Sequence, residues 1–271
     1  MQDLTNDTVV HIKKDNIEYL QFRRLLEYPE LVHCYTLSTN NFDIAGNDTM
    51  ENRKEVVLDN YRKLATTLEI DYNHIIRPYQ THTDVIRKVD ETPSTIQIFP
   101  KEYWEVDGLI TDKNNVIFSL GYADCTPLFL YDPVKKVIGN IHSGWKGTLQ
   151  RIGEKAIIKM IEEYNSNPSD IICCIGPTIR ECHFEVDVDV QELFYNEFSY
   201  LSNINDIITK KGEKYYIDTV LINRIILKEA GLKEENILDS KICTVCNYKI
   251  MHSYRVDKEV AGRNTAIMGL K

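Results

Sequence analysis

Short runs of β-branched and aromatic residues are frequent along this chain, and they do not alternate regularly with helical segments. Runs with the length and composition of strands lie at 31–37, 74–79, 84–89, 106–111, 116–120, 127–131, 137–141, 171–175 and 213–217. A doubly wound sheet needs a helix between successive strands, so this order instead favours an α+β fold with mixed β-sheets flanked by helices. No linker or low-complexity tract divides the chain, and we expect residues 1–271 to form a single domain.

Helices are predicted where apolar residues recur at three-to-four spacing. They follow Asn47 and Asp48, run from Thr148 to a stop at Asn167-Pro168, lie near 187–201, and extend from Asp218 to Gly231. In the last of these, Asp218 is a plausible N-cap and Gly231 a plausible C′ residue.

The charge balance argues against nucleic acid as a partner. Asp and Glu number 41 against 32 Lys and Arg, which gives a formal net charge of −9. A nucleic-acid surface needs a clustered basic footprint, and only short pairs such as Lys13-Lys14 occur. No apolar run approaches the roughly 20 residues of a membrane span, and the first residues lack the apolar core of a signal peptide. Seven cysteines, an odd number, then favour a reducing cytoplasm over a disulfide framework.

Two reactive clusters follow neighbouring apolar runs between residues 117 and 148. The first reads Tyr-Ala-Asp-Cys-Thr-Pro at 122–127, and the second reads His-Ser-Gly-Trp-Lys-Gly-Thr at 142–148. Gly144 and Gly147 permit a positive φ or a close backbone approach. A following helix would point its positive end at a ligand, and Lys146 adds a charge that suits phosphate. A tight turn with Trp145 as a packing anchor is the alternative.

Further polar segments lie between or after the predicted strands. They are Tyr-Gln-Thr-His-Thr-Asp at 79–84, Ile-Gly-Pro-Thr-Ile-Arg-Glu-Cys-His-Phe-Glu-Val at 175–186, and the segment 252–267. A lone histidine such as His82 is more often a surface or core residue than a ligand. Arg255 and Arg263 flank a predicted turn and could together hold a phosphate or carboxylate, with ordinary surface pairing as the alternative.

Taken together, these segments resemble the YfiH-like family, also called the polyphenol oxidase or laccase-domain family and the peptidoglycan editing factors. The matching pieces are QTH at 80–82, VDGLIT at 106–111, ADCTPLFLYDP at 123–133, HSGWKGT at 142–148, IGPTIRECHFEV at 175–186 and HSYRVDKEVAGR at 252–263. The segment 38–53 is also similar. The set runs from about residue 30 to the end, with agreeing order and spacing, which is far more specific than any single motif. The resemblance implies a YfiH-like fold, related to that of the cytotoxic necrotizing factor.

The resemblance also implies a zinc site formed by His82, Cys125 and His142. Two imidazoles and a thiolate suit Zn²⁺, and three protein ligands leave a fourth position open for water or substrate. Their wide spacing means that tertiary folding has to assemble the site.

The activity that the resemblance implies is purine nucleoside phosphorylase, acting on adenosine, inosine or guanosine, with methylthioadenosine as a further candidate. It also implies adenosine deaminase activity. For phosphate we select Lys146, Arg255 and Arg263. Asp124 and Glu185 are candidate acids, with Asp124 either orienting His82 or His142 or capping a turn.

This sequence departs from the family pattern at Lys146, where arginine is common. It also departs at His183 or Phe184, where we expect tyrosine, and at Asp187, where we expect glycine. These departures bear on substrate preference and leave the metal triad untouched.

Other interpretations remain open at this point. Cys125 could be a nucleophile with His142 as its base, in a hydrolase or amidase of peptidoglycan precursor editing, with His82 a bystander. A copper oxidase is disfavoured, because the seven histidines contain no His-x-His pair, although adventitious copper could occupy the site.

A Cys-x-x-Cys motif stands at 243–246. A zinc ribbon would need a second pair at comparable spacing, and a redox motif would have to open a helix. The segment instead looks strand-like, so we expect no function there. The adjacent Cys173 and Cys174 lie in an apolar run and are predicted to be core.

Overall fold

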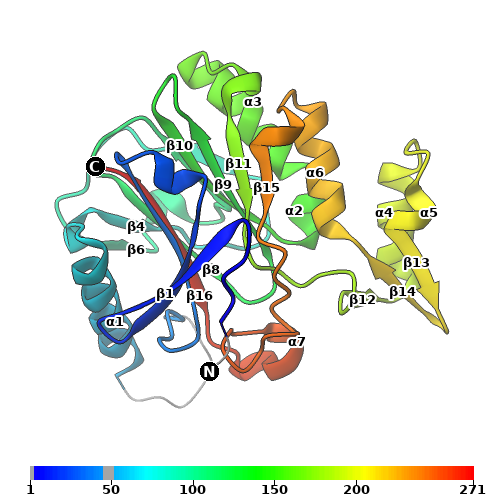
Figure 1. Ribbon diagram of the computed structural model, residues 1–271, viewed down its shortest axis with the longest axis horizontal. Helices are drawn as coiled ribbons and strands as arrows, with labels where there is room; N and C mark the ends of the chain where they lie inside the picture. The colour runs from blue at the N-terminus through cyan, green and yellow to red at the C-terminus, as the bar shows by residue number, and fades with distance from the viewer. Residues whose placement is uncertain (1–2, 45–51) are drawn as a thin grey trace.

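Two large mixed sheets form the body of the protein in the computed structural model, which describes residues 3–44 and 52–271 (Figure 1). The seven-stranded sheet has the order β1 (Val9–Lys14), β2 (Ile17–Phe22), β3 (Leu31–Thr36), β16 (Asn264–Leu270), β8 (Ile117–Tyr122), β4 (Ile75–Arg77) and β6 (Gln97–Ile98). The six-stranded sheet has the order β15 (Ile237–Asp239), β11 (Ile172–Ile175), β9 (Thr126–Asp132), β10 (Val137–Ser143), β7 (Gly108–Thr111) and β5 (Ile86–Lys88).

The sheets pack face to face, and their facing side chains form the main core. Phe118 and Met268 of the first sheet share one buried cluster with Phe129 and Ile138 of the second. Their strands are largely buried on both sides, because helices cover the outer faces. Helix α1 (Arg53–Leu68) packs on the seven-stranded sheet. Helices α3 (Ile152–Tyr164) and α6 (Thr219–Glu229) pack on the six-stranded sheet.

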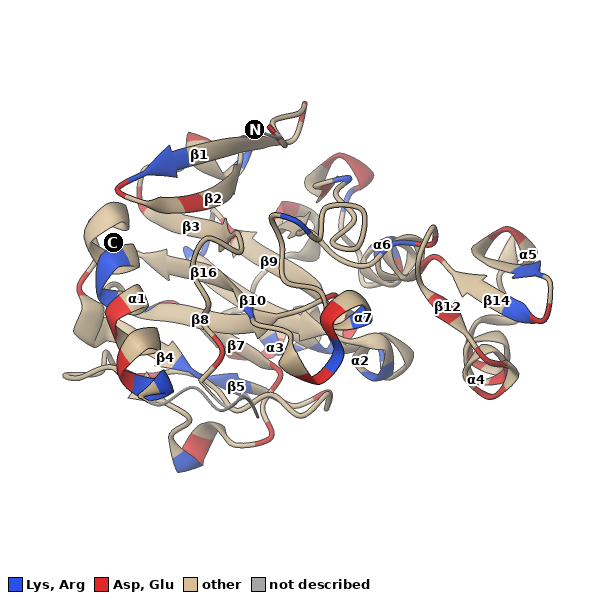
Figure 2. Ribbon diagram, turned by 90° about the horizontal axis from the view of Figure 1, so that it is seen from below, with Lys and Arg blue, Asp and Glu red and all other residues tan. Residues whose placement is uncertain are grey.

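A small lobe projects from one end of the body (Figure 2). It contains the sheet β12 (Glu185–Val186), β14 (Lys214–Ile217) and β13 (Ile208–Lys211), with α4 (Val188–Phe198) and α5 (Ile204–Ile207). Phe194, Phe198 and Ile217 are fully buried in its own apolar cluster, and Trp145 and Leu149 of α2 (Trp145–Leu149) pack against that cluster. The remaining short helix, α7 (Tyr254–Asp257), follows β15. Lysine and arginine are interspersed with acidic residues over the ribbon in Figure 2.

The mixed α+β class predicted from the sequence is confirmed, and every predicted strand run overlaps an observed strand. The apolar stripe of the first helix is buried, although Asn47 and Asp48 lie outside the described residues. The last predicted helix is also confirmed: Asp218 accepts a hydrogen bond from the backbone N–H of Leu221, and Gly231 has a φ of +100°. Within the described ranges, no helix is long and apolar enough to cross a bilayer.

One predicted helix start is wrong. The helix expected after Thr148 begins at Trp145, runs for five residues as α2, and restarts at Ile152 as α3. Arg151 separates the two because it adopts a left-handed conformation with a φ of +58°. Some observed strands were not predicted, namely β1, β2, β6, β12, β13, β15 and β16, and of these β16 lies in the middle of the seven-stranded sheet.

Candidate metal centre and its pocket

Strand pairing brings Cys125 next to His142. Cys125 lies just before β9, where the chain crosses from β8 in one sheet to β9 in the other. Strand β10 pairs antiparallel with β9 so that Ser143 lies opposite Thr126 and His142 opposite Pro127. His82 reaches the same point from the loop between β4 and β5. The β9–β10 pairing and the loop between β4 and β5 therefore bring together three residues that are far apart in the sequence.

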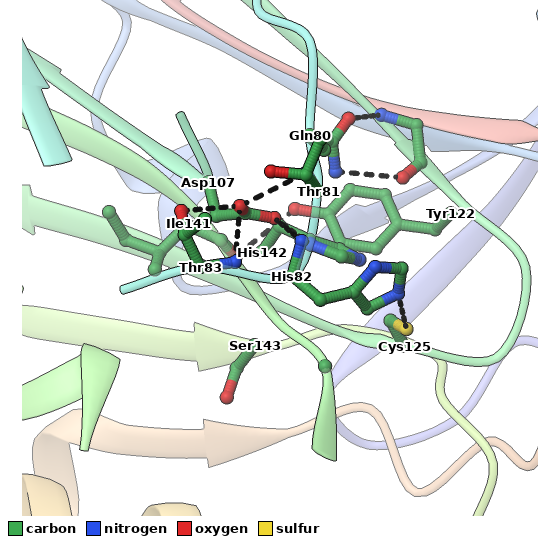
Figure 3. Close-up of polar contacts among 12 residues, drawn as sticks. Gln80, Thr81, His82, Thr83, Asp107, Tyr122, Cys125, Ile141, His142 and Ser143 are labelled. Carbon is green, nitrogen blue, oxygen red and sulfur yellow. Dashed lines mark hydrogen bonds and ion pairs between the residues drawn. The ribbon is translucent and has the colours of Figure 1, made fainter. Parts of the chain in front are cut away.

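The three predicted ligands form one cluster (Figure 3). Their ligand atoms all lie within 4.8 Å of one another, and Cys125 Sγ is 3.6 Å from His82 Nε2. The imidazole centroids of His82 and His142 are 5.0 Å apart. His142 is buried, Cys125 is half-buried and His82 is exposed, so the cluster has one side open to a pocket.

Asp107 holds the two histidines of this cluster in place through hydrogen bonds to His142 and to the loop that carries His82. Its carboxylate, which is completely buried, accepts a 2.6 Å hydrogen bond from His142 Nδ1. It also accepts hydrogen bonds from the backbone N–H groups of Thr81, His82 and Thr83. Because His142 Nδ1–H donates its hydrogen bond to Asp107, Nε2 is the ring nitrogen left for a ligand. Burial alone would raise the pKa of Asp107, but these bonds, above all that from His142, hold it below its ordinary value.

Backbone conformation also adapts to the cluster. His82 has a φ of +64°, a left-handed conformation that costs a non-glycine residue free energy. Gly144 lies against His82 and Cys125. A Cβ built at Gly144 would be 2.7 Å from His82 Cδ2 and 3.3 Å from Cys125 Sγ. The predicted close approach at Gly144 is confirmed.

Cys125 has the electrostatics of a reactive thiol. Burial alone would raise its pKa, but the neighbouring charge of His142 and hydrogen bonds from both imidazoles lower the pKa to about 6. The same contact, with Asp107 behind it, raises the pKa of His142. At neutral pH this favours the thiolate, which is the form that binds metal or attacks an electrophile.

Asp124 does not orient either histidine, and that part of its predicted role is wrong. One carboxylate oxygen accepts from Thr244 Oγ1, and the other accepts from Ser253 Oγ at 3.0 Å and from the Arg255 backbone N–H at 2.6 Å. Both oxygens are thus taken up by the chain around the start of α7. The alternative role of capping a turn describes Asp124 well.

The predicted phosphate ligands lie around the same pocket, whose volume is about 1120 Å³. Lys146 is exposed, with its Nζ 5.5 Å from the centroid of the Trp145 ring. Arg255 donates to the carbonyl oxygens of His183 and Glu185, at 2.9 and 3.0 Å. Arg263 donates to the carbonyl oxygens of its own loop. The long helix expected behind Lys146 is absent, because α2 ends at Leu149.

Glu185 also lines the pocket, where it accepts a 2.6 Å hydrogen bond from the Tyr216 hydroxyl.

Sequence reasoning missed three residues of this site. Asp107 is the most important, and its only signal was its place in the VDGLIT segment. Gln80 anchors the His82 loop, because its side chain both donates to the Gly121 carbonyl and accepts from the Gly121 N–H. Arg77 is 4% exposed, lines the pocket and donates to the Tyr61 hydroxyl at 2.6 Å, and nothing in the sequence distinguished it.

Comparisons with known proteins identify the family. The chain is 33% identical over 217 residues to purine nucleoside phosphorylase YlmD of Bacillus subtilis, covering 79% of this chain and 77% of that protein. It is 30% identical over 220 residues to adenosine deaminase RL5 from an unknown prokaryotic organism, covering 80% of each. The crystal structure of Bacillus licheniformis hypothetical protein YfiH superposes with a TM-score of 0.83 at 27% identity, covering 96% of this chain and 98% of that one.

The sequence profile of the family described as multi-copper polyphenol oxidoreductase laccase matches residues 36–271. These residues include the QTH, ADC and HSGWKGT segments and the pocket that they line. The resemblance predicted from the motifs is therefore confirmed, and the chain belongs to this laccase-like family of YfiH proteins.

Proposed function

We propose that this protein is a zinc-dependent purine nucleoside phosphorylase, acting on adenosine, inosine or guanosine, with adenosine deamination as a second activity. Relatives that carry these two names support the reaction classes. The observation that carries the proposal is the pocket itself, which is lined both by the His82–Cys125–His142 cluster and by Lys146, Arg255 and Arg263. Residues 1–271 would act as one domain, in the cytoplasm that the free thiols favour.

The donor set of the cluster fits Zn²⁺. Two imidazole nitrogens and a thiolate are ligands that zinc accepts, and three of them correspond to a catalytic rather than a closed structural site. When bound, zinc would supply Lewis acidity toward an oxygen atom of water or substrate. The family description names copper, but the histidine-rich sets of multicopper oxidases are not found among the described residues.

The residues of this chain have separate tasks in such a reaction. Phosphorolysis joins a phosphate oxygen to ribose C1′ as the C1′–N9 bond breaks, and the purine leaves with the electron pair. Lys146, Arg255 and Arg263 would hold the phosphate and offset its charge. Asp107 and Gln80 hold the loop of His82 and the ring of His142, so the ligands meet the substrate already oriented.

A product assay tests the function directly. We expect purified protein to convert inosine into hypoxanthine and ribose 1-phosphate only when phosphate is present, and adenosine into inosine without phosphate. Chromatographic separation of base, nucleoside and sugar phosphate measures both reactions. No product from folded, zinc-loaded protein with any of the three nucleosides would contradict the proposal.

Removing the cationic charges should weaken phosphate binding. We expect Lys146→Met, Arg255→Met and Arg263→Met each to raise the phosphate KM by about tenfold or more, since a hydrogen bond to a charged group contributes about 1.5–3 kcal/mol. Initial rates at varied phosphate and fixed inosine measure this, with the nucleoside KM as the internal reference. Lys135→Met, in the exposed turn between β9 and β10, is the matched control. Unchanged phosphate KM in all three variants would remove these residues from the phosphate site.

A second candidate is a Cys–His hydrolase, and one observation favours it. Cys125, His142 and Asp107 form a nucleophile, base and orienting carboxylate in series, with the pKa of the thiol lowered to about 6. Such an enzyme would keep its activity after chelation and lose it on thiol alkylation. A zinc phosphorylase would lose its activity to the chelator and regain it on addition of Zn²⁺.

A further inference from the structure

A second cluster of thiols and imidazole lies beside the pocket, outside the cluster already described. It consists of Cys182, His183, Cys243 and Cys246, whose ligand atoms all lie within 4.8 Å of one another. Cys243 is buried, His183 is half-buried, and the other two are exposed. Neither the three thiols nor the imidazole has a role in the proposed reaction.

The fold assembles this cluster from two segments far apart in sequence. Strands β11 and β15 run parallel, with Ile175 opposite Asp239, so the loops that follow them leave the same end of the sheet. The loops then stay together: Thr178 bridges to Cys243, and the Arg180 guanidinium makes a bidentate pair with Asp239 at 2.8 and 2.9 Å. Cys182-His183 and Cys243–Cys246 therefore meet as a consequence of strand pairing.

The distances within the cluster match a tetrahedral ion. Cys182 Sγ lies 3.6 Å from Cys243 Sγ and 3.8 Å from Cys246 Sγ. His183 Nδ1 lies 3.1, 3.8 and 3.5 Å from the sulfur atoms of Cys182, Cys243 and Cys246. Zinc bonds of about 2.3 Å to sulfur and about 2.0 Å to nitrogen, at tetrahedral angles, place sulfur atoms about 3.8 Å apart and sulfur about 3.5 Å from nitrogen. A disulfide would need a sulfur–sulfur distance of about 2.05 Å, and all these cysteines are free.

We infer that Cys182, His183, Cys243 and Cys246 bind a second zinc ion, in a closed Cys₃His site. Four protein ligands fill the tetrahedral shell, which is the pattern of a structural ion, whereas the first cluster offers three. This inference does not depend on the proposed enzymatic activity.

This inference replaces the prediction that the Cys-x-x-Cys motif has no function with the proposal that both of its thiols bind zinc. Its second pair of ligands exists, but it is Cys182-His183, 61 residues before Cys243, rather than another Cys-x-x-Cys. The segment is also not a strand: residues 244–250 form turns, closed by a hydrogen bond from the Asn247 side chain to the Cys243 carbonyl. A turn places the two thiols on the same side, as a metal site requires.

The ion would hold one wall of the pocket. Arg255 donates to the His183 carbonyl, and Asp124 accepts from Thr244, so residues next to the ligands contact residues that line the pocket. The second zinc would thus fix the position of the loop that carries Arg255 without contacting substrate itself.

Metal analysis of single variants tests the site. We expect about two zinc ions per chain in protein purified under reducing conditions, and about one in Cys246→Ser and in Cys125→Ala, measured by elemental mass spectrometry. The exposed position of Cys246 makes a serine mild for folding, which circular dichroism checks. Cys34→Ala, a buried thiol outside both clusters, should keep both ions. Wild-type zinc content in folded Cys246→Ser would overturn the inference.

Cobalt binding provides a spectroscopic test of the same site that does not rely on comparing the zinc contents of variants. Co²⁺ added to metal-free Cys125→Ala should give the intense absorption of thiolate-to-cobalt charge transfer and the visible bands of a tetrahedral ion. Both should be absent in Cys125→Ala combined with Cys182→Ser. An intact-mass measurement that finds a disulfide among Cys182, Cys243 and Cys246 in reduced, metal-supplied protein would refute the site, as would no cobalt spectrum in Cys125→Ala.

Discussion

Cys125→Ala should lose about one zinc ion per chain and about a hundredfold or more of the nucleoside-cleaving activity. The substitution removes the one thiolate of the His82–Cys125–His142 cluster, and two imidazoles alone hold zinc weakly. The Lewis acidity of a bound metal stabilises a transition state by several kcal/mol, and each 1.36 kcal/mol of lost stabilisation lowers the rate tenfold. Zinc content and the initial rate of purine release with phosphate are the two measurements.

The matched control is Cys34→Ala, which removes a buried thiol of β3 that does not line the pocket and should keep both activity and zinc. If Cys125→Ala retains the full zinc content of the wild type, the assignment of this ligand is wrong. If it loses activity while chelation leaves the wild type fully active, the Cys–His hydrolase becomes the better description.

The second large effect is expected at Asp107. Asp107→Ala should lower the free energy of unfolding by about 3–5 kcal/mol, because it leaves the buried donor of His142 and three partly buried backbone N–H groups without their acceptor. Asp107→Asn keeps the shape and should lower zinc affinity or activity by about 10–100-fold, the usual effect of losing the carboxylate behind a ligating histidine. Denaturant unfolding and zinc titration measure the two effects.

Asp90→Asn is the control for Asp107, since Asp90 pairs with Lys88 on the surface, where an ion pair contributes at most about 1 kcal/mol. A variant Asp107→Asn with wild-type zinc affinity and activity would show that His142 needs no orienting partner.

Local sequence patterns predicted those parts of the fold that local chemistry determines. The apolar spacing of α1 and the capping pair Asp218 and Gly231 show in the sequence because neighbouring residues create them. Strand β16 did not show, because NTAIMGL is buried on both faces and has no alternation for a pattern to detect. The break at Arg151 was also invisible, because arginine is not a residue type that marks a left-handed conformation.

The candidate site shows the same contrast between residues that local sequence marks and contacts that only tertiary pairing creates. Residues alone left His82, Cys125 and His142 as separate candidates, and only the family resemblance grouped them. Asp107 escaped notice because a single aspartate before a strand resembles any turn residue, while its partners come from β10 and from the loop 81–83. Cys182-His183 and Cys243–Cys246 were separated for the same reason, since parallel pairing of β11 and β15 brings them together.

The position of β16 has a consequence for how this protein is made. Ala266 pairs with Tyr35 on one side and with Leu120 on the other, so residues 264–270 separate β3 from β8 in the finished sheet. Until residues 264–270 have been synthesised, β3 and β8 each present an unpaired edge where β16 will lie. Exposed strand edges are templates for aggregation, and contacts so distant in sequence form slowly. A nascent chain of this protein therefore passes through a long interval in which chaperones that cover open strand edges would protect it.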